Sequence, residues 1–143
     1  MSSDDRFDEF EKIFWQLSRK MEYVWQDIYA KTFPGSQSQI VYLLAQGGPK
    51  KMSELANSLH ITAGAVTIAA DLLIERGHVI RYRNEGDRRV VQLELTEKGR
   101  SRVDELQEEG KQVMKSVFEA VSDRDFILMN KIFKQASAKI DEL

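Results

Sequence analysis

Cysteine is absent from this 143-residue sequence, and proline and histidine occur only twice each. Without cysteine the chain has no disulfide, no thiolate metal ligand and no thiol nucleophile. His60 and His78 are too few for a zinc site unless carboxylates complete it, and we expect His78 to pack in an apolar slot after Gly77. No Gly-rich phosphate loop and no paired histidines with a carboxylate at helical spacing occur either. We therefore predict no catalytic residue, no cofactor and no metal, with a histidine-carboxylate metal sensor as the alternative.

Long apolar runs are missing as well. No stretch approaches the ~18 to 20 apolar residues of a membrane span, and residues 1–8 lack the basic start and apolar centre of a signal peptide. Hydrophobic residues make up 42% of the chain and charged residues 31%, a balance typical of a folded, helix-rich protein. We expect a cytoplasmic protein without a membrane partner.

Basic residues are concentrated in one short segment. The net charge of the chain is -2, so bulk charge gives no support for nucleic-acid binding. Between Arg76 and Arg89, however, five arginines stand against Glu85 and Asp87, which gives this segment a charge of +3 and leaves -5 for the remainder. The sequence therefore contains a segregated basic patch.

An apolar seam predicts a long helix at residues 4–30. Its apolar side chains alternate steps of three and four, which is the a/d spacing of packed helices. Such a helix is about 40 Å long at roughly 1.5 Å per residue and outreaches the core of a domain this size. The seam is either intramolecular core or a dimer interface, and we favour the dimer. The predicted dimerisation residues of this helix are Phe7, Phe10, Phe14 and Leu17.

Two closely spaced helices are predicted in the centre of the chain, after a short helix at 36–46. Ser53 is placed to cap a helix at 53–59, and Thr62 to cap a helix at 62–76. Only two or three residues separate these two helices, and small side chains leave the early turns of the second helix unobstructed. This is the outline of a helix-turn-helix.

A β-hairpin is predicted next, within residues 79–95. Two strands with alternating apolar residues are joined by Asn84, Gly86 and Asp87, which are turn-forming residues. Helix, turn, helix and hairpin, in that order, are typical of a winged helix-turn-helix, whose second helix enters the major groove of DNA. The hairpin, or wing, reaches a minor groove, where the concentrated negative potential attracts arginine.

Two more helices are predicted at the C-terminal end. Thr96 begins the first, and Ser122 followed by Asp125 is a start signal for the second. We expect the last helix to contribute to the dimer interface through Met129, Phe133 and Ile140.

The predicted fold is mainly α-helical with a small β-hairpin wing. Long N- and C-terminal dimerisation helices flank a winged helix-turn-helix domain. We expect a dimerisation helix at 1–33, the DNA-binding domain at 34–97 and further dimerisation helices at 98–143.

Specific residues follow one another through the wing and the two central helices. The wing contains Asp87-Arg88-Arg89, then Leu93, Leu95-Thr96 and Gly99. The supporting residues are Glu54-Leu55-Ala56, Leu59, Val66-Thr67, Leu73, Gly77, Val79 and Arg81. In this joint order and spacing the chain resembles the MarR family of bacterial transcription regulators, over essentially its whole length.

The resemblance implies a homodimeric regulator, most often a repressor, that binds a pseudo-palindromic operator in double-stranded DNA through recognition helix 62–76 and wing 79–95. A small-molecule effector is expected to release it. By the same resemblance, Arg89 enters the minor groove, Asp87 orients it and Arg81 lies near the phosphate backbone. The residues predicted to contact DNA are Ser53, Thr62, Ala63, Gly64, Thr67, Arg81, Arg83, Asp87, Arg88 and Arg89.

The recognition helix departs from the family pattern. The family commonly has Arg or Lys after the position of Thr67, whereas Ile68 follows here and residues 62–71 contain no basic side chain. A bidentate arginine contact with guanine from this helix is therefore excluded. Threonine hydroxyls, apolar contact with thymine methyls and close backbone approach at Gly64 remain, so we expect an A·T-rich site and reliance on the wings. His60 in the turn is a second departure.

Aromatic residues cluster between the long helix and the DNA-binding part. They are either core and interface residues or the walls of a small-molecule pocket, which in the family tends to lie at this junction. The tentative pocket residues are Trp15, Trp25, Tyr29 and Phe33.

A different class of function is kept as the alternative: a winged-helix protein-protein interaction module without specific DNA binding. Its best support is the missing basic residue in the recognition helix. In that case Arg88 and Arg89 lie in a solvated turn with a surface ion pair, which contributes little to stability.

Overall fold

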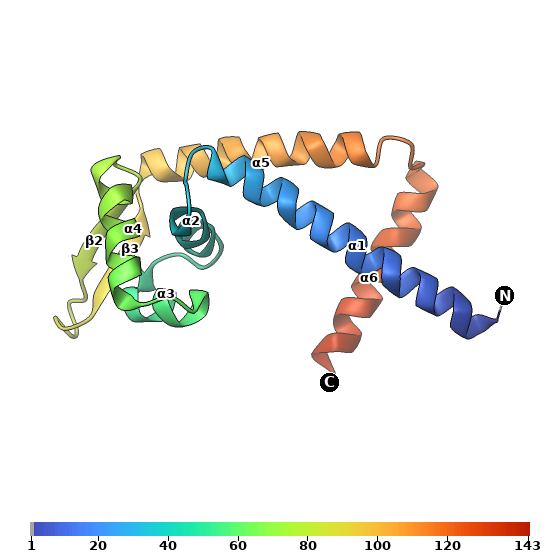
Figure 1. The fold of residues 1–143 in the computed structure, drawn as a ribbon, viewed down its shortest axis with the longest axis horizontal. Helices are drawn as coiled ribbons and strands as arrows, with labels where there is room; N and C mark the ends of the chain where they lie inside the picture. The colour runs from blue at the N-terminus through green and yellow to red at the C-terminus, as the bar shows by residue number, and fades with distance from the viewer. Residues whose placement is uncertain (1) are drawn as a thin grey trace. The chain divides into compact units, whose positions relative to one another are not determined.

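The computed structural model describes residues 2–143, which form six α-helices and one three-stranded antiparallel sheet (Figure 1). The chain divides into two compact units, Met1–Gly110 and Lys111–Leu143, and one helix runs from the first into the second. The mainly helical fold with a β-hairpin wing is confirmed. In chain order the elements are α1 (Ser3–Ala30), α2 (Ser36–Gly47), β1 (Lys50–Lys51), α3 (Met52–Leu59), α4 (Ala63–Glu75), β2 (Val79–Arg83), β3 (Val91–Leu95), α5 (Glu97–Val117) and α6 (Asp123–Asp141).

Helix α1 is buried only near its C-terminal end. It begins with a capping box, in which the backbone N–H of Asp5 donates to Ser2 Oγ and the backbone N–H of Ser2 donates to the Asp5 carboxylate, both at 3.1 Å. Residues 2–17 are all exposed, whereas Ile28 and Tyr29 are buried. The apolar seam predicted for this helix therefore joins the core over its last two turns only.

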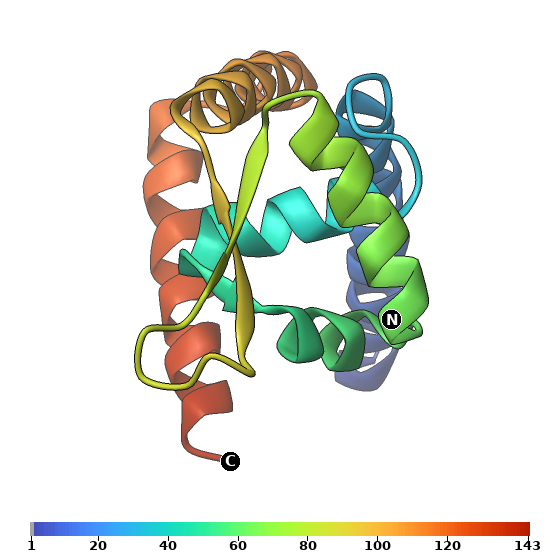
Figure 2. The ribbon, with the colours of Figure 1, turned by 90° about the vertical axis from the view of Figure 1, so that its left-hand side faces the viewer.

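The winged domain is built from α2, α3 and α4 packed around the small sheet (Figure 2). Helix α4 contacts α2, α3 and strand β2, while α2 contacts β3. Burying each of the large aliphatic side chains stabilises the domain by roughly 1.5 to 3 kcal/mol. The largest fully buried side chains are Phe33, Ile40, Leu44, Leu55, Leu73, Leu93, Leu106, Val41, Val66, Val79 and Val103.

Two caps of the helix-turn-helix can be compared with their predictions. Thr62 caps α4, because its Oγ1 accepts a hydrogen bond of 3.0 Å from the backbone N–H of Ala65. The prediction that Ser53 caps the preceding helix is wrong. Helix α3 begins one residue earlier at Met52, with the extended residue Lys51 at its N-cap and no side-chain cap.

The sheet has the strand order β1-β3-β2, and all pairs are antiparallel. Strands β2 and β3 form the predicted hairpin, with Val79 opposite Leu95 and Arg83 opposite Val91. The third strand, β1, was not predicted from the sequence, because two residues are too few to display an alternation. It pairs Lys51 with Gln92 and so adds two lysines to the edge of the wing.

Helix α5 packs on the winged domain through its first four turns. Gly99 permits the closest approach, since a Cβ there would lie 2.1 Å from the carbonyl oxygen of His78. Val103 and Leu106 are buried one and two turns later. The helix therefore closes the core behind the wing.

Helix α6 lies in the second unit. Ser122 caps it as predicted, accepting a hydrogen bond of 3.1 Å from the backbone N–H of Asp125. None of its residues is buried, and Phe133 and Ile140 are 60% and 66% exposed. Its predicted apolar face is thus open within a single chain.

Within residues 2–143, no single helix combines the length and apolar composition needed to cross a membrane. Helices α3 and α4 taken together meet both criteria, but they are bent by 115° at the turn between them. Leu55 of α3 and Leu73 of α4 are buried in the winged domain.

Candidate DNA-binding surface and effector cavity

Over its first two turns, the outer face of α4 carries small or apolar side chains. Ala63, Gly64 and Thr67 are exposed, and Ile68 is 66% exposed. A Cβ added at Gly64 would meet no atom closer than 3.9 Å, so the backbone there is open to a neighbouring molecule. The helix thus presents backbone and methyl groups where a DNA-reading helix would meet base edges.

The turn between α3 and α4 depends on His60, whose backbone adopts the left-handed conformation with φ of 53°. Its N–H donates to the carbonyl groups of Ala56 and Asn57 and so closes the C-terminal end of α3. Glycine or asparagine usually holds this position. This explains the second departure noted in the sequence: His60 is exposed and acts through its backbone.

The wing loop is held by hydrogen bonds from residues next to it. Asn84 Oδ1 accepts from the backbone N–H groups of Gly86 at 2.8 Å and Asp87 at 3.2 Å, which forms an Asx turn. The guanidinium of Arg83 donates to the carbonyl oxygen of Arg88 at 2.7 Å. Arg83 therefore stabilises the loop that carries Arg88, and both residues lie at the wing as predicted.

Asp87 and Arg89 form a clamp at the wing tip. The Arg89 guanidinium donates to both carboxylate oxygens, at 3.1 and 3.2 Å, and the Arg89 backbone N–H donates at 3.0 Å. These bonds from the side chain and backbone of Arg89 hold the pKa of the Asp87 carboxyl below its usual value. The Arg89 side chain is nevertheless 92% exposed. The clamp therefore orients an arginine without burying it.

Positive charge near the wing comes from β1 as well. Lys51 lies opposite Gln92 of the wing strand β3, and its charge also contributes to the low pKa of Asp87. The sequence reasoning missed Lys50 and Lys51, although a Lys-Lys pair directly after the Gly-Gly-Pro break was a visible signal.

An ion pair links the recognition helix to the wing. Arg81 of β2 donates to the carboxylate of Asp71, and both side chains remain partly exposed. The pair neutralises the acidic group on the outer face of α4. Arg81 thus lies between the recognition helix and the wing.

His78 connects α4 to β2 and is buried. Its ring meets that of Phe33 edge-on, with centroids 5.0 Å apart and planes at 78°, and its Nδ1 has no hydrogen-bond partner among residues 2–143. Burial lowers the pKa of His78, and the positive charges of Lys98, Arg76 and Arg102 lower it further. The predicted packing of His78 after Gly77 is confirmed.

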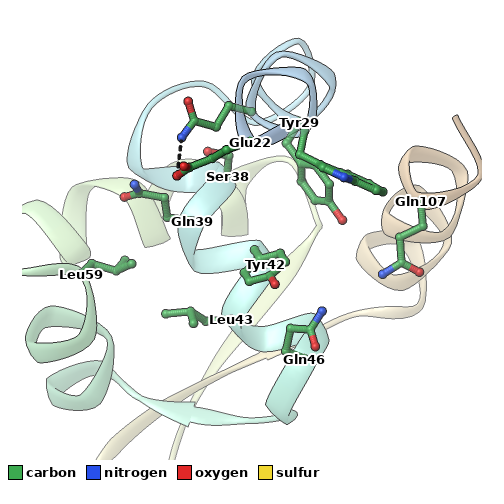
Figure 3. Close-up of a pocket in the computed structure, with 11 residues that line it drawn as sticks. Glu22, Tyr29, Ser38, Gln39, Tyr42, Leu43, Gln46, Leu59 and Gln107 are labelled. Carbon is green, nitrogen blue, oxygen red and sulfur yellow. Dashed lines mark hydrogen bonds between the residues drawn. The ribbon is translucent and has the colours of Figure 1, made fainter. Parts of the chain in front are cut away.

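A cavity of about 700 Å³ is lined by residues of α1, α2 and α5 and by Leu59 of α3 (Figure 3). Its polar groups are mainly glutamine amides and tyrosine hydroxyls. Glu22 is the one acidic residue of the wall, and its carboxylate accepts from Gln26 Nε2 at 3.3 Å. The lining residues are Glu22, Trp25, Gln26, Tyr29, Ser38, Gln39, Tyr42, Leu43, Gln46, Leu59 and Gln107.

Trp25 and Tyr29 are the predicted pocket residues that line this cavity. Trp25 lies against α5, where a Cβ on Gly110 would come within 2.2 Å of its ring. Burial raises the pKa of the Tyr29 phenol, although a hydrogen bond with Gln107 opposes the shift. The two other predicted residues are not in the wall: Trp15 is 54% exposed, and Phe33 is fully buried against His78.

Metal ligands are not gathered anywhere in the described chain. Within residues 2–143, no group of three or more His, Asp or Glu side chains is arranged to hold an ion. His60 is exposed, whereas His78 is buried among aromatic and basic neighbours.

Known proteins resemble this chain in sequence and in fold. Residues 35–91 match the model of the MarR family. The HTH-type transcriptional regulator YpoP of Bacillus subtilis (strain 168) is 25% identical over 128 residues, covering 90% of this chain and 88% of that protein.

Two solved structures are similar in fold. A MarR family protein from Bacillus stearothermophilus superposes with a TM-score of 0.77 at 21% identity, covering 99% of both chains. NadR, solved in complex with 4-hydroxyphenylacetate, superposes with a TM-score of 0.61 at 23% identity, covering 86% of this chain and 88% of that chain.

The family match covers the elements that form the exposed face of α4 and the clamped wing. The similarity of fold extends beyond them to the flanking helices. Over residues 35–91 this chain matches the MarR family, and its winged helix-turn-helix fold is the fold of MarR family structures.

Proposed function

We propose that this chain acts as a homodimeric repressor that binds a pseudo-palindromic DNA operator and releases it when a small molecule fills the cavity. The observation that carries the proposal is the clamp of Asp87 and Arg89 at the tip of the wing, next to an unobstructed recognition helix. A guanidinium held outward by a carboxylate is already oriented for the minor groove, so little conformational entropy is lost on binding.

DNA reading is divided between two elements in this proposal. The N-terminal turns of α4, from the cap Thr62 to Thr67, face the major groove, and Ser53 at the start of α3 lies near the phosphate backbone. Arg83, Arg88 and Arg89 bring positive charge to the wing, as do the lysines of β1. Contacts of these basic side chains with phosphates supply affinity that falls with salt concentration. They also position the protein on DNA so that other residues can read bases.

The dimer is supported by apolar side chains that a single chain leaves in water. In α1, Phe7 is 61% and Phe10 is 55% exposed, and Phe14 and Leu17 are each 40% exposed. In α6, Phe133 and Ile140 are exposed and Met129 is half-buried. Apolar stripes of this extent mark protein interaction surfaces. We therefore propose that 1–33 and 98–143 form the dimer around the DNA-binding domain 34–97.

In the proposed mechanism of repression, dimerisation sets the distance between the two recognition helices. Two recognition helices read successive major grooves only if they lie about 34 to 36 Å apart. A ligand that prefers another spacing shifts the dimer away from DNA by the difference in its affinity for the two states. An occupied operator blocks transcription, and ligand binding restores it.

Selection of random duplex DNA by the purified protein tests the DNA-binding proposal. The wild type is expected to enrich an inverted repeat, and an Arg88→Ala, Arg89→Ala double variant is expected to lose it while remaining folded. Sedimentation of both proteins at micromolar concentration tests the dimer. A folded protein that enriches no sequence would favour the protein-interaction alternative, as would binding that does not weaken with salt.

The chemistry of the cavity wall limits the effector. The wall has one carboxylate, Glu22, no lysine or arginine, and an indole, two phenols and several carboxamides. Without a cation, a bound carboxylate would lose its hydration and meet Glu22. We therefore propose an uncharged or cationic aromatic effector, in contrast to the anionic 4-hydroxyphenylacetate in the NadR structure.

A matched pair of probes tests this effector class. In a Trp15→Phe variant, the fluorescence of Trp25 reports on the cavity alone, because the chain has two tryptophans. 4-Hydroxyphenylacetamide is expected to change this fluorescence at lower concentration than 4-hydroxyphenylacetate. Replacing Gln107→Arg is expected to reverse the order, since it places a cation in the wall. The proposal would be contradicted if the protein without the Gln107→Arg change bound 4-hydroxyphenylacetate as tightly as 4-hydroxyphenylacetamide, or more tightly.

A further inference from the structure

Ile68 is the most exposed large apolar side chain of the winged domain. It is 66% exposed on α4, while Val66, Ala69 and Leu73 turn the opposite face of that helix into the core. Leu72, one turn after Ile68, is 41% exposed and extends the apolar surface. An aliphatic side chain exposed on this face is available to an apolar group of a bound molecule.

The side chains of Thr62, Thr67 and Asp71 are already engaged in hydrogen bonds or an ion pair. The hydroxyl of Thr67 donates to the carbonyl oxygen of Ala63 at 3.0 Å, and the hydroxyl oxygen of Thr62 accepts from the backbone of Ala65 at 3.0 Å. The carboxylate of Asp71 is paired with Arg81. The described helix contains no Lys, Arg, Asn or Gln between Ala63 and Glu75. It therefore offers neither the guanidinium that reads guanine nor the amide that reads adenine.

Only one base carries an apolar group in the major groove, which is the 5-methyl of thymine. We propose that Ile68 is a specificity-determining residue of this regulator, which reads a thymine in each operator half-site by covering its 5-methyl group. This inference rests on the proposed DNA-binding function and adds to it the residue and the atom that are recognised. The wing supplies affinity for any A·T-rich minor groove, and Ile68 supplies a position-dependent choice.

The expected size of the effect follows from the burial of one methyl group. Taking about one methylene-sized group out of water changes a binding constant by about fourfold at room temperature. With one Ile68 contact in each half-site, loss of both thymine methyls should weaken binding by about fifteenfold, if the two sites act independently.

Replacing thymine by deoxyuridine, one position at a time, tests the inference on the operator selected by the wild-type protein. Deoxyuridine keeps every hydrogen-bonding group of thymine and lacks only the 5-methyl. We expect one position, or two adjacent positions, in each half-site at which deoxyuridine weakens wild-type binding about fourfold. The Ile68→Ala variant is expected to bind the thymine operator about as weakly as the wild type binds the deoxyuridine operator. At that position it should no longer distinguish the two bases.

A matched variant controls for the loss of an exposed aliphatic side chain elsewhere in the winged domain. Ile80 of β2 is also exposed, at 47%, but lies on the wing strand and not on α4. The Ile80→Ala variant should retain the full deoxyuridine effect. Because Ile68 is 66% exposed, the melting temperature of Ile68→Ala should stay near that of the wild type.

The outcomes separate this inference from the function on which it rests. An operator that wild type binds equally well with thymine or deoxyuridine at every position would overturn the role of Ile68 and leave the DNA-binding proposal intact. The same holds if Ile68→Ala retains the full sensitivity to deoxyuridine. A folded protein that selects no operator would overturn both.

Discussion

The wing and the recognition helix α4 follow each other in the chain, yet they differ in charge, polarity and internal bonding. The wing carries arginines held by carboxylate, carbonyl and Asx-turn hydrogen bonds. Helix α4 has no basic side chain, and its outer face is formed by methyl groups and open backbone. Affinity and specificity are thus assigned to different elements in our proposal. Affinity comes mainly from the charge of the wing, and specificity comes from the shape of the apolar groups on α4.

The largest expected effect falls on the wing. We expect Arg89→Ala to weaken specific DNA binding by roughly 1 to 3 kcal/mol, because it removes an oriented guanidinium from the minor groove. Titration of the selected operator at fixed salt measures this loss. Arg124→Ala removes the same charge from an exposed site on α6 and should change binding little. Wild-type affinity in Arg89→Ala would remove the wing from the mechanism.

A smaller effect on DNA binding is expected for Asp87→Asn, and its direction distinguishes two roles of Asp87. Removal of a negative charge near phosphates should by itself strengthen DNA binding. If the clamp orients Arg89, binding should instead weaken about threefold to tenfold, in line with the loss of one or two charge-assisted hydrogen bonds. Glu85→Gln is the control, since it removes the same charge from an exposed residue of the loop and should strengthen binding slightly. Equal changes in both variants would show that Asp87 acts only through its charge.

Salt dependence sharpens the contrast between the two elements. Each phosphate contact contributes about -0.9 to the slope of log affinity against log salt. Arg88→Ala should therefore make the slope shallower by about this amount for every contact it loses. Ile68→Ala should lower affinity about fourfold per half-site with an unchanged slope, because it removes an apolar contact. A changed slope in Ile68→Ala would mean that α4 also positions charge.

The smallest effect concerns His78, which joins the two elements. Burial keeps its pKa below the usual 6.5, so the unfolded chain binds a proton more readily than the folded chain. Stability should be full above about pH 7 and fall as the pH drops through 6.5 toward the lowered pKa. For a single group the slope is at most about 1.4 kcal/mol per pH unit.

Chemical unfolding between pH 7 and 5 measures the contribution of His78. The His78→Phe variant keeps an aromatic ring against Phe33 and should lose the corresponding part of the pH dependence. His60→Asn removes the other histidine from an exposed site that tolerates the left-handed conformation, and it should leave the pH dependence in place. An unchanged pH profile in His78→Phe would show that another group is responsible.

Much of the winged domain could be predicted from the sequence because its signals are local. Thr62 caps α4 and Gly77 ends it with a φ of 82°, as side-chain chemistry and backbone freedom require. The alternation of apolar residues predicted the two strands of the hairpin. The pairing of Asp87 with Arg89 was expected from the family resemblance, and it forms within a single tight turn.

Other features depend on contacts between distant segments. Strand β1 exists only because Lys50 and Lys51 reach β3, about forty residues later in the chain. Ser53 has the chemistry of a cap, but α3 begins at Met52 in the place set by that pairing.

By itself, then, the sequence determined the order of the helices and of the hairpin, the helix caps at Thr62 and Ser122, the wing turn and the absence of a base-reading arginine in α4. Only the tertiary structure decided which aromatic residues line the cavity. Trp25 and Tyr29 meet the glutamines of α2 and α5 there, whereas Phe33 turns into the core and Trp15 stays in water. The physical reason is the distance along the sequence over which each interaction acts. Capping and turns act within four residues, but a cavity forms only when helices from distant parts of the chain pack together.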